Sequence, residues 1–431
     1  MEQTLEKAKR SHPPTSYWLD TAPPPPSPAE PSLPSHTDVA VIGGGYTGVS
    51  AARTLARHGL DVTVLEAQTL GWGASTRNGG FVLPGFKVGA DELLKQHGAV
   101  RARALFAASL GAVRFLEDLV ASEAIECEYA RCGYVALAWK PGHYAALERS
   151  AALLSRTFAY ETELVPPGRL RSELASDAYH GGLLEPAGGI HPAKYFFGMA
   201  AAARRAGARL LEGVEVRRLR RTTGGFDLTT SRGPMRAREI LVATNGYSGD
   251  VAPRLRRGVV PIGSYIIATA PLDARVAQDL IPRRRVMSDT KNLLFYFRLT
   301  ADNRLLFGGR ASFTPTTTAA SARILARGMT HVFPQLAGVS VEYSWMGKVG
   351  YTFDQLPHAG TMDGVHYALG YCGHGVALAT YLGARVADAI AGKGDLLPFS
   401  ELRFPTMPFY RKRPWFLPLA GAWYRLKDLV S

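Results

Sequence analysis

A chain of 431 residues exceeds the ~250 to 300 residues at which one hydrophobic core stops growing, so the length predicts two structural domains. Hydrophobic residues make up 46% of the sequence and charged residues 20%, which excludes a disordered chain and indicates a globular one. The net charge of +14 includes scattered arginine runs, without the aromatic-interleaved stripe or zinc-finger spacing of nucleic-acid-binding proteins. We therefore expect a solvated basic surface and no nucleic-acid partner.

The cysteines and the N-terminal residues bear on the compartment. Only three cysteines occur, Cys127, Cys132 and Cys372, and none has metal-ligand partners at a usual spacing. We interpret them as small buried thiols in a reducing compartment, with no disulfide framework and no metal. Residues 1–20 lack the apolar core of a signal peptide, and no run of roughly 18 apolar residues occurs in the sequence. These features predict a cytoplasmic protein without a membrane span.

The first part of the chain reads as a tether followed by a βαβ unit. Prolines between Pro13 and Pro34 force an extended, polyproline-like segment. Residues 38–42 have the pattern of a buried strand, residues 47–58 have helical periodicity, and residues 62–65 form the next strand. The unit is complete within about 30 residues, as in nucleotide-binding folds.

Beyond this unit the sequence predicts helices mixed with short strands. A glycine-rich loop at 71–80 precedes a long helix at 92–123 and a strand pair within 126–139. The remaining predicted elements are a helix at 194–206, strands near 209–219, 226–230, 239–244, 261–270, 293–299, 304–309, 341–351 and 365–370, and a helix at 376–391. Nucleotide-type α/β pieces at the beginning, middle and end thus enclose β-rich inserts.

This order predicts a mixed α/β fold, in which a Rossmann-like dinucleotide-binding domain is interleaved with a β-sheet substrate domain. We expect an N-terminal arm with the proline-rich tether at 1–36 and a C-terminal tail at 401–431. The expected bounds are 37–90, 188–258 and 353–400 for the dinucleotide-binding domain, and 91–187 and 259–352 for the substrate domain.

A glycine-rich turn, Gly43-Gly-Gly45-Tyr-Thr-Gly48, joins the first strand to the first helix. Its glycines allow a tight turn, close approach of the backbone to a pyrophosphate and close packing of helix on strand. Glu66 ends the second strand, where a carboxylate can accept hydrogen bonds from both hydroxyls of an adenosine ribose. The combination predicts a dinucleotide site; the alternative is an ordinary βα turn with a solvated Glu66.

Two further glycine-rich segments favour a longer, embedded cofactor. The loop 71–80 bears hydroxyl and amide side chains, and residues 367–376 repeat the order of strand, glycine turn and helix. A second helix N-terminus is suited to stabilise the negative charge that a reduced flavin develops around N1 and its C2 carbonyl. The predicted cofactor contacts are Gly43, Gly45, Tyr46, Thr47, Gly48, Glu66, Ala67, Gly73, Ala74, Ser75, Asn78, Gly79, Gly80, Val216, Ala243, Thr244, Gly373, His374, Gly375 and Val376.

At these segments the sequence resembles the D-amino-acid-oxidase-like flavoproteins and, within them, the gamma-glutamylputrescine oxidase branch. The resemblance rests on DVAVIGGGYTG, VTVLEA, GWGASTRNGG, EILVATNGY, RLLFGGR and GYCGHGVALATYLG. It extends from an SYW segment before the proline tether to the C-terminal tail. It implies an FAD cofactor, a Rossmann-like FAD-binding domain and a β-sheet substrate domain that covers the flavin ring.

The resemblance also bears on how the flavin is held. Relatives of sarcosine oxidase place a flavin-bound cysteine just before the Tyr-Thr pair that is Tyr351-Thr352 here, but residues 348–350 read Lys-Val-Gly. Relatives of dimethylglycine dehydrogenase place a flavin-bound histidine where this loop has Asn78. We therefore predict tight, non-covalent FAD.

By position in the resembled pattern, Tyr296, Arg310 and Tyr351 face the flavin from the substrate sheet. Tyr296 and Arg298 share one face of their strand, because side chains alternate with a period of two. Lys348 is a further catalytic candidate, either for oxygen activation or for substrate charge. The alternatives are tyrosines packed in the sheet core and a solvated Arg310.

The helix after the third glycine turn departs from the sarcosine oxidases, which hold the substrate carboxylate with a lysine at the position of Ala377. Unless Arg310 or Lys348 substitutes, an α-carboxylate would be buried without a partner, at a cost of several kcal/mol. The sequence thus favours an amine, or an amino acid whose carboxylate lies far from the flavin, as in gamma-glutamylputrescine. We expect His374 to be a loop residue at the flavin edge rather than a general base.

The expected reaction is oxidative deamination of a small-molecule amine. A hydride leaves the carbon that bears the amine for flavin N5, the imine is hydrolysed to an aldehyde, and O2 reoxidises the cofactor. The alternative is a D-amino-acid, glycine or sarcosine oxidase or dehydrogenase that passes electrons to a quinone, with the aromatic and basic tail 404–429 touching a membrane. A flavin-binding protein without turnover and a flavin monooxygenase remain further alternatives.

Overall fold

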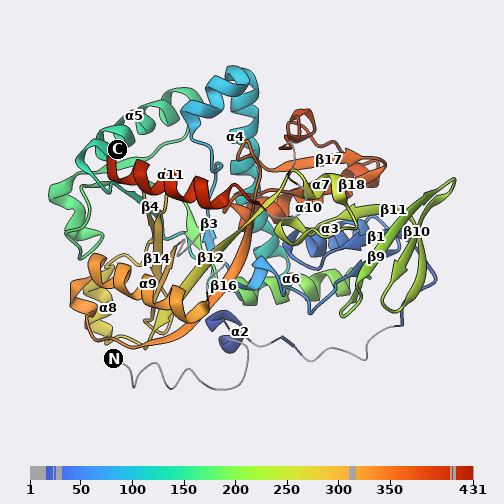
Figure 1. The fold of residues 1–431 in the computed structure, drawn as a ribbon, viewed down its shortest axis with the longest axis horizontal. Helices are drawn as coiled ribbons and strands as arrows, with labels where there is room; N and C mark the ends of the chain where they lie inside the picture. Colours follow the sequence, from blue (N-terminus) through green and yellow to red (C-terminus); the bar gives the residue numbers. More distant parts are fainter. Residues whose placement is uncertain are drawn as a thin grey trace.

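A computed structural model gives the fold and describes residues 16–22, 24–25, 32–309, 317–407, 410 and 414–430. Within these ranges the β structure comprises two eight-stranded sheets and a two-stranded ribbon. In Figure 1 the strands of the first sheet lie on the right and those of the second sheet on the lower left. The mixed α/β architecture predicted from the sequence is confirmed.

The first sheet is built around β1 (His36–Ile42). This strand pairs in parallel with β2 (Val62–Leu65) on one side and with β11 (Gly233–Val242) on the other. Val39 and Val41 point into one hydrophobic core, and Ala40 and Ile42 point into a second core. This alternation is expected for a strand that is covered on both faces. The sheet also contains β17 (His358–Met362), β18 (Val365–Leu369), β8 (Arg209–Leu211), β9 (Val216–Thr222) and β10 (Gly225–Thr230).

Helices cover one face of this sheet. α3 (Tyr46–Arg57) packs against α10 (Gly375–Ile390), and α6 (Pro192–Arg205) and α4 (Ala90–Ser122) complete the same hydrophobic core. Gly383 permits this close packing, because a Cβ at that position would lie 2.3 Å from a backbone oxygen of α3. The beginning of α3 is thereby held against α10.

One face of the second sheet packs against helices, and the opposite face lies toward the loops that follow strands of the first sheet. On β14 (Phe295–Leu299), Phe297 packs in a hydrophobic cluster with α9 (Thr318–Val332), whereas Tyr296 and Arg298 point to the opposite face. This confirms the alternation predicted for that strand. The sheet order is β16 (Val341–Tyr351), β12 (Val260–Thr269), β15 (Leu305–Gly309), β14, β13 (Val286–Asp289), β4 (Tyr134–Leu137), β6 (Gly182–Glu185) and β5 (Glu163–Val165).

Two terminal helices lie across this framework. α2 (Tyr17–Thr21) packs against the second sheet, and α11 (Leu417–Val430), red in Figure 1, crosses the molecule near the C terminus. Asp428 of α11 accepts hydrogen bonds from the backbone N–H groups of Asn292 (2.8 Å) and Leu293 (3.0 Å), which follow β13. None of the helices in the described ranges is long and apolar enough to cross a membrane.

Further elements connect the two sheets. They are the helices α5 (Pro141–Phe158), α7 (Pro253–Arg256) and α8 (Ala274–Leu280), the ribbon strands β3 (Phe81–Val82) and β7 (Gly188–Gly189), and the short turns η1 (Ala74–Thr76), η2 (Pro167–Ser172), η3 (Asn245–Tyr247), η4 (Pro334–Leu336) and η5 (Phe399–Glu401). The sequence patterns above did not predict α5 or α9.

One predicted element is wrong. In place of a strand pair within 126–139, the structure has β4 and a single bridge between Ala130 and Gly189. Glu128 adopts a φ of 53°, which leaves the extended region and interrupts pairing at that point. Segments of the chain contribute strands alternately to the first and the second sheet, as expected for interleaved domains. The bounds of the two domains stay a prediction.

Candidate active site

The glycine turn between β1 and α3 forms one wall of a cavity of about 400 Å³. Gly43 has a φ of 106°, and a Cβ on it would lie 2.9 Å from the carbonyl oxygen of Ala243. A Cβ on Gly48 would lie 1.9 Å from the carbonyl oxygen of Gly43, so glycine is required for α3 to approach the strand this closely. Backbone rather than side chain therefore faces the cavity at this turn, which is the surface that a pyrophosphate needs.

Glu66 lies at the end of β2 on the wall of the same cavity. Its Oε2 accepts a hydrogen bond of 2.7 Å from the backbone N–H of Gly44, and its Oε1 accepts one of 2.9 Å from that of Gln68. Because a carboxylate has about four acceptor sites, each oxygen can still accept a hydroxyl. The two backbone contacts fix the orientation of the carboxylate on the cavity wall.

The loop 71–80 is held in place by Asn78, whose side-chain amide donates to the carbonyl oxygens of Ala74 (3.1 Å) and Ser75 (3.0 Å). Its Oδ1 accepts a hydrogen bond of 2.8 Å from the backbone N–H of Gly80. The hydroxyl of Ser75 in turn accepts a hydrogen bond of 2.9 Å from the backbone N–H of Tyr46, at the start of α3. The loop and the first glycine turn therefore form one hydrogen-bonded wall.

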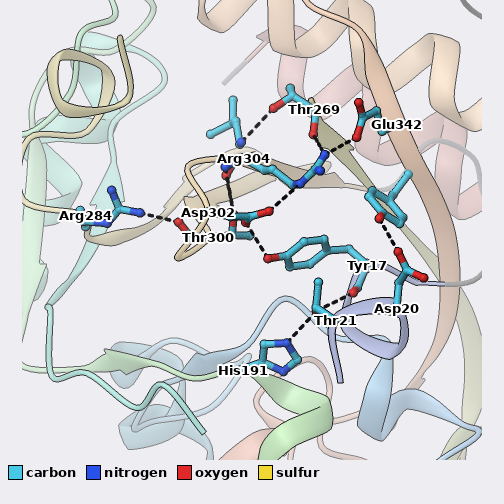
Figure 2. Close-up of polar contacts among 12 residues, drawn as sticks. Tyr17, Asp20, Thr21, His191, Thr269, Arg284, Thr300, Asp302, Arg304 and Glu342 are labelled. Carbon is cyan, nitrogen blue, oxygen red and sulfur yellow. Dashed lines mark hydrogen bonds and ion pairs between the residues drawn. The ribbon is translucent and has the colours of Figure 1, made fainter. Parts of the chain in front are cut away.

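The N-terminal helix α2 joins this loop to the second sheet. Trp18 Nε1 donates a 2.7 Å hydrogen bond to the carbonyl oxygen of Asn78. On the other side of α2, the hydroxyl of Tyr17 donates to Asp302 Oδ1 at 2.6 Å, and Thr21 Oγ1 lies 3.0 Å from His191 Nε2 (Figure 2). Sequence reasoning used the SYW segment only as part of the resemblance and missed this contact, which joins residues 60 positions apart.

A third turn precedes α10. Gly370 and Gly373 have φ values of 82° and 102°, and Asn245 Oδ1 accepts a 2.9 Å hydrogen bond from the backbone N–H of Gly370. His374 follows, with its Nδ1 buried and without a hydrogen-bond partner among the described residues. Burial lowers the pKa of His374 to about 4, so the imidazole is neutral at pH 7. The start of α10 thus offers a helix N-terminus and a buried, unpaired polar atom.

A second cavity of about 450 Å³ lies between this turn and the second sheet. The two cavities meet, because both are lined by Ala74, Asn78, Lys348, Val349, Cys372, Gly373 and Val376. We call this meeting point the junction. A long cofactor with its ribose at Glu66 would bring its far end to the junction, beside the N-terminus of α10. The residues present therefore fit FAD.

The structure brings most of the predicted cofactor contacts together. Those that line the first cavity are Gly43, Gly45, Tyr46, Thr47, Glu66, Ala67, Gly73, Ala74, Ser75, Asn78, Val216, Ala243, Thr244, Gly373, Gly375 and Val376. Gly79 and His374 line only the second cavity. Gly48 and Gly80 line neither cavity and act in packing; a Cβ on Gly80 would lie 2.3 Å from the carbonyl oxygen of Ile190.

Some lining residues of the first cavity were missed. They include Gln68, Trp72, Asn245, Tyr247, Tyr371 and Cys372. Asn245 and Tyr247 lie in the EILVATNGY segment quoted above, so the motif itself was the available signal. Cys127 and Cys372 are buried, as predicted, whereas Cys132 is only partly buried, contrary to the prediction. Burial raises the pKa of the Cys372 thiol to about 11.

Three of the four catalytic candidates line the second cavity, namely Tyr296, Lys348 and Tyr351. The hydroxyl of Tyr296 lies 2.9 Å from Ser264 Oγ on β12. The fourth candidate, Arg310, lies outside the described residues. Ala377 is buried in the core and lines neither cavity.

The second cavity also has polar lining residues that the sequence did not reveal, among them Tyr134, Glu185, Asp289 and Lys291. They lie on or beside β4, β6 and β13, strands remote from the glycine motifs in sequence. No local pattern marks them, because only the strand order of the second sheet brings them to one cavity.

Comparison with known proteins agrees with this geometry. A family model described as FAD dependent oxidoreductase matches residues 38–389. Gamma-glutamylputrescine oxidoreductase of Escherichia coli (strain K12) is 35% identical over 91% of this chain and 93% of that protein. The probable oxidoreductase OrdL of Haemophilus influenzae is 36% identical over 86% of this chain and 87% of its own length. The crystal structure of glycine oxidase from Geobacillus kaustophilus superposes with a TM-score of 0.71 at 24% identity, over 86% of this chain and 99% of that chain.

Proposed function

Since the chain belongs to the family of FAD-dependent oxidoreductases, we propose that it oxidises a primary or secondary amine of the gamma-glutamylputrescine type. The observation that carries this proposal is the 35% identity, over nine tenths of both chains, to a gamma-glutamylputrescine oxidoreductase. Bound FAD would supply the two-electron acceptor, taking a hydride from the carbon that bears the amine. The amine thereby becomes an imine, which water hydrolyses to an aldehyde and ammonia, or to an aldehyde and a smaller amine where the substrate is a secondary amine.

The chain's own residues have separate tasks in this proposal. Glu66 binds the ribose hydroxyls, the backbone of the first glycine turn meets the pyrophosphate, and the N-terminus of α10 stabilises negative charge at the junction. Tyr296 and Tyr351 orient the amine from the second sheet and exclude water. Lys348 lines both cavities and so lies at the junction, where it can meet a negative charge on the substrate.

The amine preference follows from charge at the junction. Ala377 supplies no cation there, so an α-carboxylate would depend on Lys348 or on Arg310 for a partner. An amine that carries its charged groups far from the reacting carbon avoids this requirement. Purified protein should therefore release aldehyde, and hydrogen peroxide in air, when supplied with gamma-glutamylputrescine; absence of both products, with flavin present, contradicts the proposal.

A second candidate is an amine or amino-acid dehydrogenase that reduces a membrane quinone instead of O2. It is favoured by one specific observation: large apolar side chains are exposed at helical spacing on and just before α11, namely Trp415, Leu419, Trp423 and Leu426. Co-sedimentation with vesicles containing phosphatidylglycerol, together with substrate-dependent reduction of a soluble ubiquinone analogue, tests it. Rapid O2 consumption without vesicle binding would favour the oxidase.

A further inference from the structure

Glu185 ends β6 at the side of the second cavity remote from the junction. In the described part of the chain, no lysine, arginine or histidine forms an ion pair with its carboxylate. The hydroxyl of Tyr160 lies beside it, but makes no hydrogen bond of ordinary geometry. A carboxylate that lines a cavity without a cationic partner is an unused site for a positive charge.

Among the described residues, the polar neighbours of Glu185 are tyrosines rather than cations, namely Tyr134 on the paired strand and Tyr160. Phe106 of α4 and Leu154 of α5 line the same cavity. Burial raises the pKa of Glu185 to about 7, since its charged form loses hydration there. A ligand cation that reached the carboxylate would replace this lost hydration and favour the charged form.

Another pair of charged residues that lines the same cavity is already matched. Lys291 Nζ lies 3.0 Å from Asp289 Oδ2 and 3.7 Å from the ring centroids of both Trp139 and Phe295. Asp289 Oδ1 accepts hydrogen bonds from the backbone N–H groups of Lys291 and Phe295, each at 3.2 Å. Asp289 and Lys291 therefore neutralise each other, and neither of them pairs with Glu185.

Strand register gives the distance between this carboxylate and the reacting end of the cavity. Tyr296 pairs with Ser288, Ser288 pairs with Ala136, and Glu185 pairs with Tyr134 on the same strand as Ala136. Three strand spacings of about 4.8 Å thus separate Tyr296 from Glu185 across the sheet, and the offset from Ala136 to Tyr134 adds about 7 Å along the strands. The two backbone positions therefore lie roughly 16 Å apart. The cavity therefore extends well beyond the space that a glycine-sized substrate occupies.

From these contacts we infer that Glu185 forms a subsite for a second ammonium group, carried at the far end of an extended amine substrate. The inference rests on the proposed function, because the reacting amine must lie at the junction for the second group to reach Glu185. It specifies what that proposal left open, namely which charge the substrate carries away from its reacting carbon. The α-ammonium of a gamma-glutamyl group meets this description.

The test compares two ligands that differ in one group. Gamma-glutamylputrescine has the distal ammonium, and N-(4-aminobutyl)glutaramate is the same molecule without it. Anaerobic titration of the holoenzyme should give tighter binding of the first ligand by roughly 10- to 100-fold, the range of a charge-assisted contact. Glu185→Gln should remove this preference, whereas Glu163→Gln, an exposed carboxylate on the neighbouring β5, should keep it.

Binding and flavin reduction are measured in the same titration, by calorimetry and by absorbance. A Glu185-dependent preference without flavin reduction by either ligand supports the subsite and overturns the proposed function. Flavin reduction with the same affinity for both ligands, or a preference that persists in a correctly folded Glu185→Gln holoenzyme, overturns the subsite and leaves the proposed function standing. The melting temperature and flavin content of each variant establish that it is folded.

Discussion

The indole N–H of Trp18 donates a 2.7 Å hydrogen bond to the backbone carbonyl of Asn78. The Asn78 side chain in turn holds the loop 71–80, whose residues line both cavities. An N-terminal residue thereby supports the cofactor wall across an interval of 60 positions.

Replacing Trp18 by Phe should weaken FAD retention. The change keeps an aromatic ring in the hydrophobic cluster around Tyr17 and Trp345, but it leaves the Asn78 carbonyl without its hydrogen-bond donor. The loss of one such buried hydrogen bond corresponds to roughly a 10-fold rise in the dissociation constant of FAD. Flavin fluorescence on serial dilution measures it. Trp423→Phe, on the exposed face of α11, is the matched control, and equal retention in both variants would show that α2 does not support the loop.

Replacing Glu66 by Ala should lower FAD affinity by roughly 10- to 100-fold, because an ionised acceptor for two ribose hydroxyls is lost. Glu66→Gln should lose less, since the amide oxygen still accepts one hydrogen bond. Reconstitution of the apoprotein with FAD gives both values. Glu239→Ala removes an exposed carboxylate of β11 and serves as the control. An unchanged FAD affinity in Glu66→Ala would contradict the assigned role.

Acid precipitation should release all flavin into the supernatant. Residue 349 is valine at the position where a cysteine would be needed for a covalent flavin link. The Asn78 side chain forms hydrogen bonds within the loop 71–80 and offers no atom for such a link. Cys372 is the thiol that lines the junction, but burial raises its pKa to about 11, which keeps it protonated and unreactive at pH 7. Flavin in the pellet would contradict this prediction, and its release in Cys372→Ala would then identify the link.

The Glu185→Gln protein should be more stable than the wild type at pH 8, by an amount on the order of a few kcal/mol. Burial raises the pKa of Glu185 from 4.5 to about 7, so the folded protein keeps this proton after the unfolded chain has lost it. The contribution of Glu185 to the free energy of unfolding therefore falls between about pH 4.5 and 7, and glutamine removes this fall. Asp289, whose pKa burial raises to about 6, is common to both proteins and cancels.

Melting temperatures at pH 5 and pH 8 decide the matter. The advantage of Glu185→Gln should be small at pH 5 and full at pH 8. A difference that does not change with pH would mean that Glu185 is ionised in the folded protein over the whole range, contrary to the raised pKa that its burial predicts.

The structural features that could be predicted from the sequence are those that depend on a short run of neighbouring residues. The turn at Gly43 needs glycine for its φ of 106°, and Glu66 follows at the end of the next strand, so both could be found from spacing alone. Glu185 and Trp18 could not be found in this way. Their roles depend on strand order and on a contact between distant segments, and neither leaves a periodic or local pattern.

The helix α5 was missed for a different reason. α5 buries only Leu154 and Phe158, so its apolar stripe is too narrow for periodicity to mark it. The segment 126–139 shows the opposite error, because alternation predicted pairing that the positive φ of Glu128 interrupts.

The central claim, an amine substrate without an α-carboxylate near the flavin, is tested most directly by anaerobic flavin reduction with matched ligands. Gamma-glutamylputrescine should bleach the flavin band faster than glycine, sarcosine or D-alanine. With alanine at position 377, an α-carboxylate at the junction would depend on Lys348, which is exposed to solvent and whose Nζ lies 5.3 Å from the centroid of the Tyr247 ring. If instead an α-amino acid reduces the flavin faster, and Arg310→Ala abolishes its advantage, the enzyme is an amino-acid oxidase and the amine assignment is wrong.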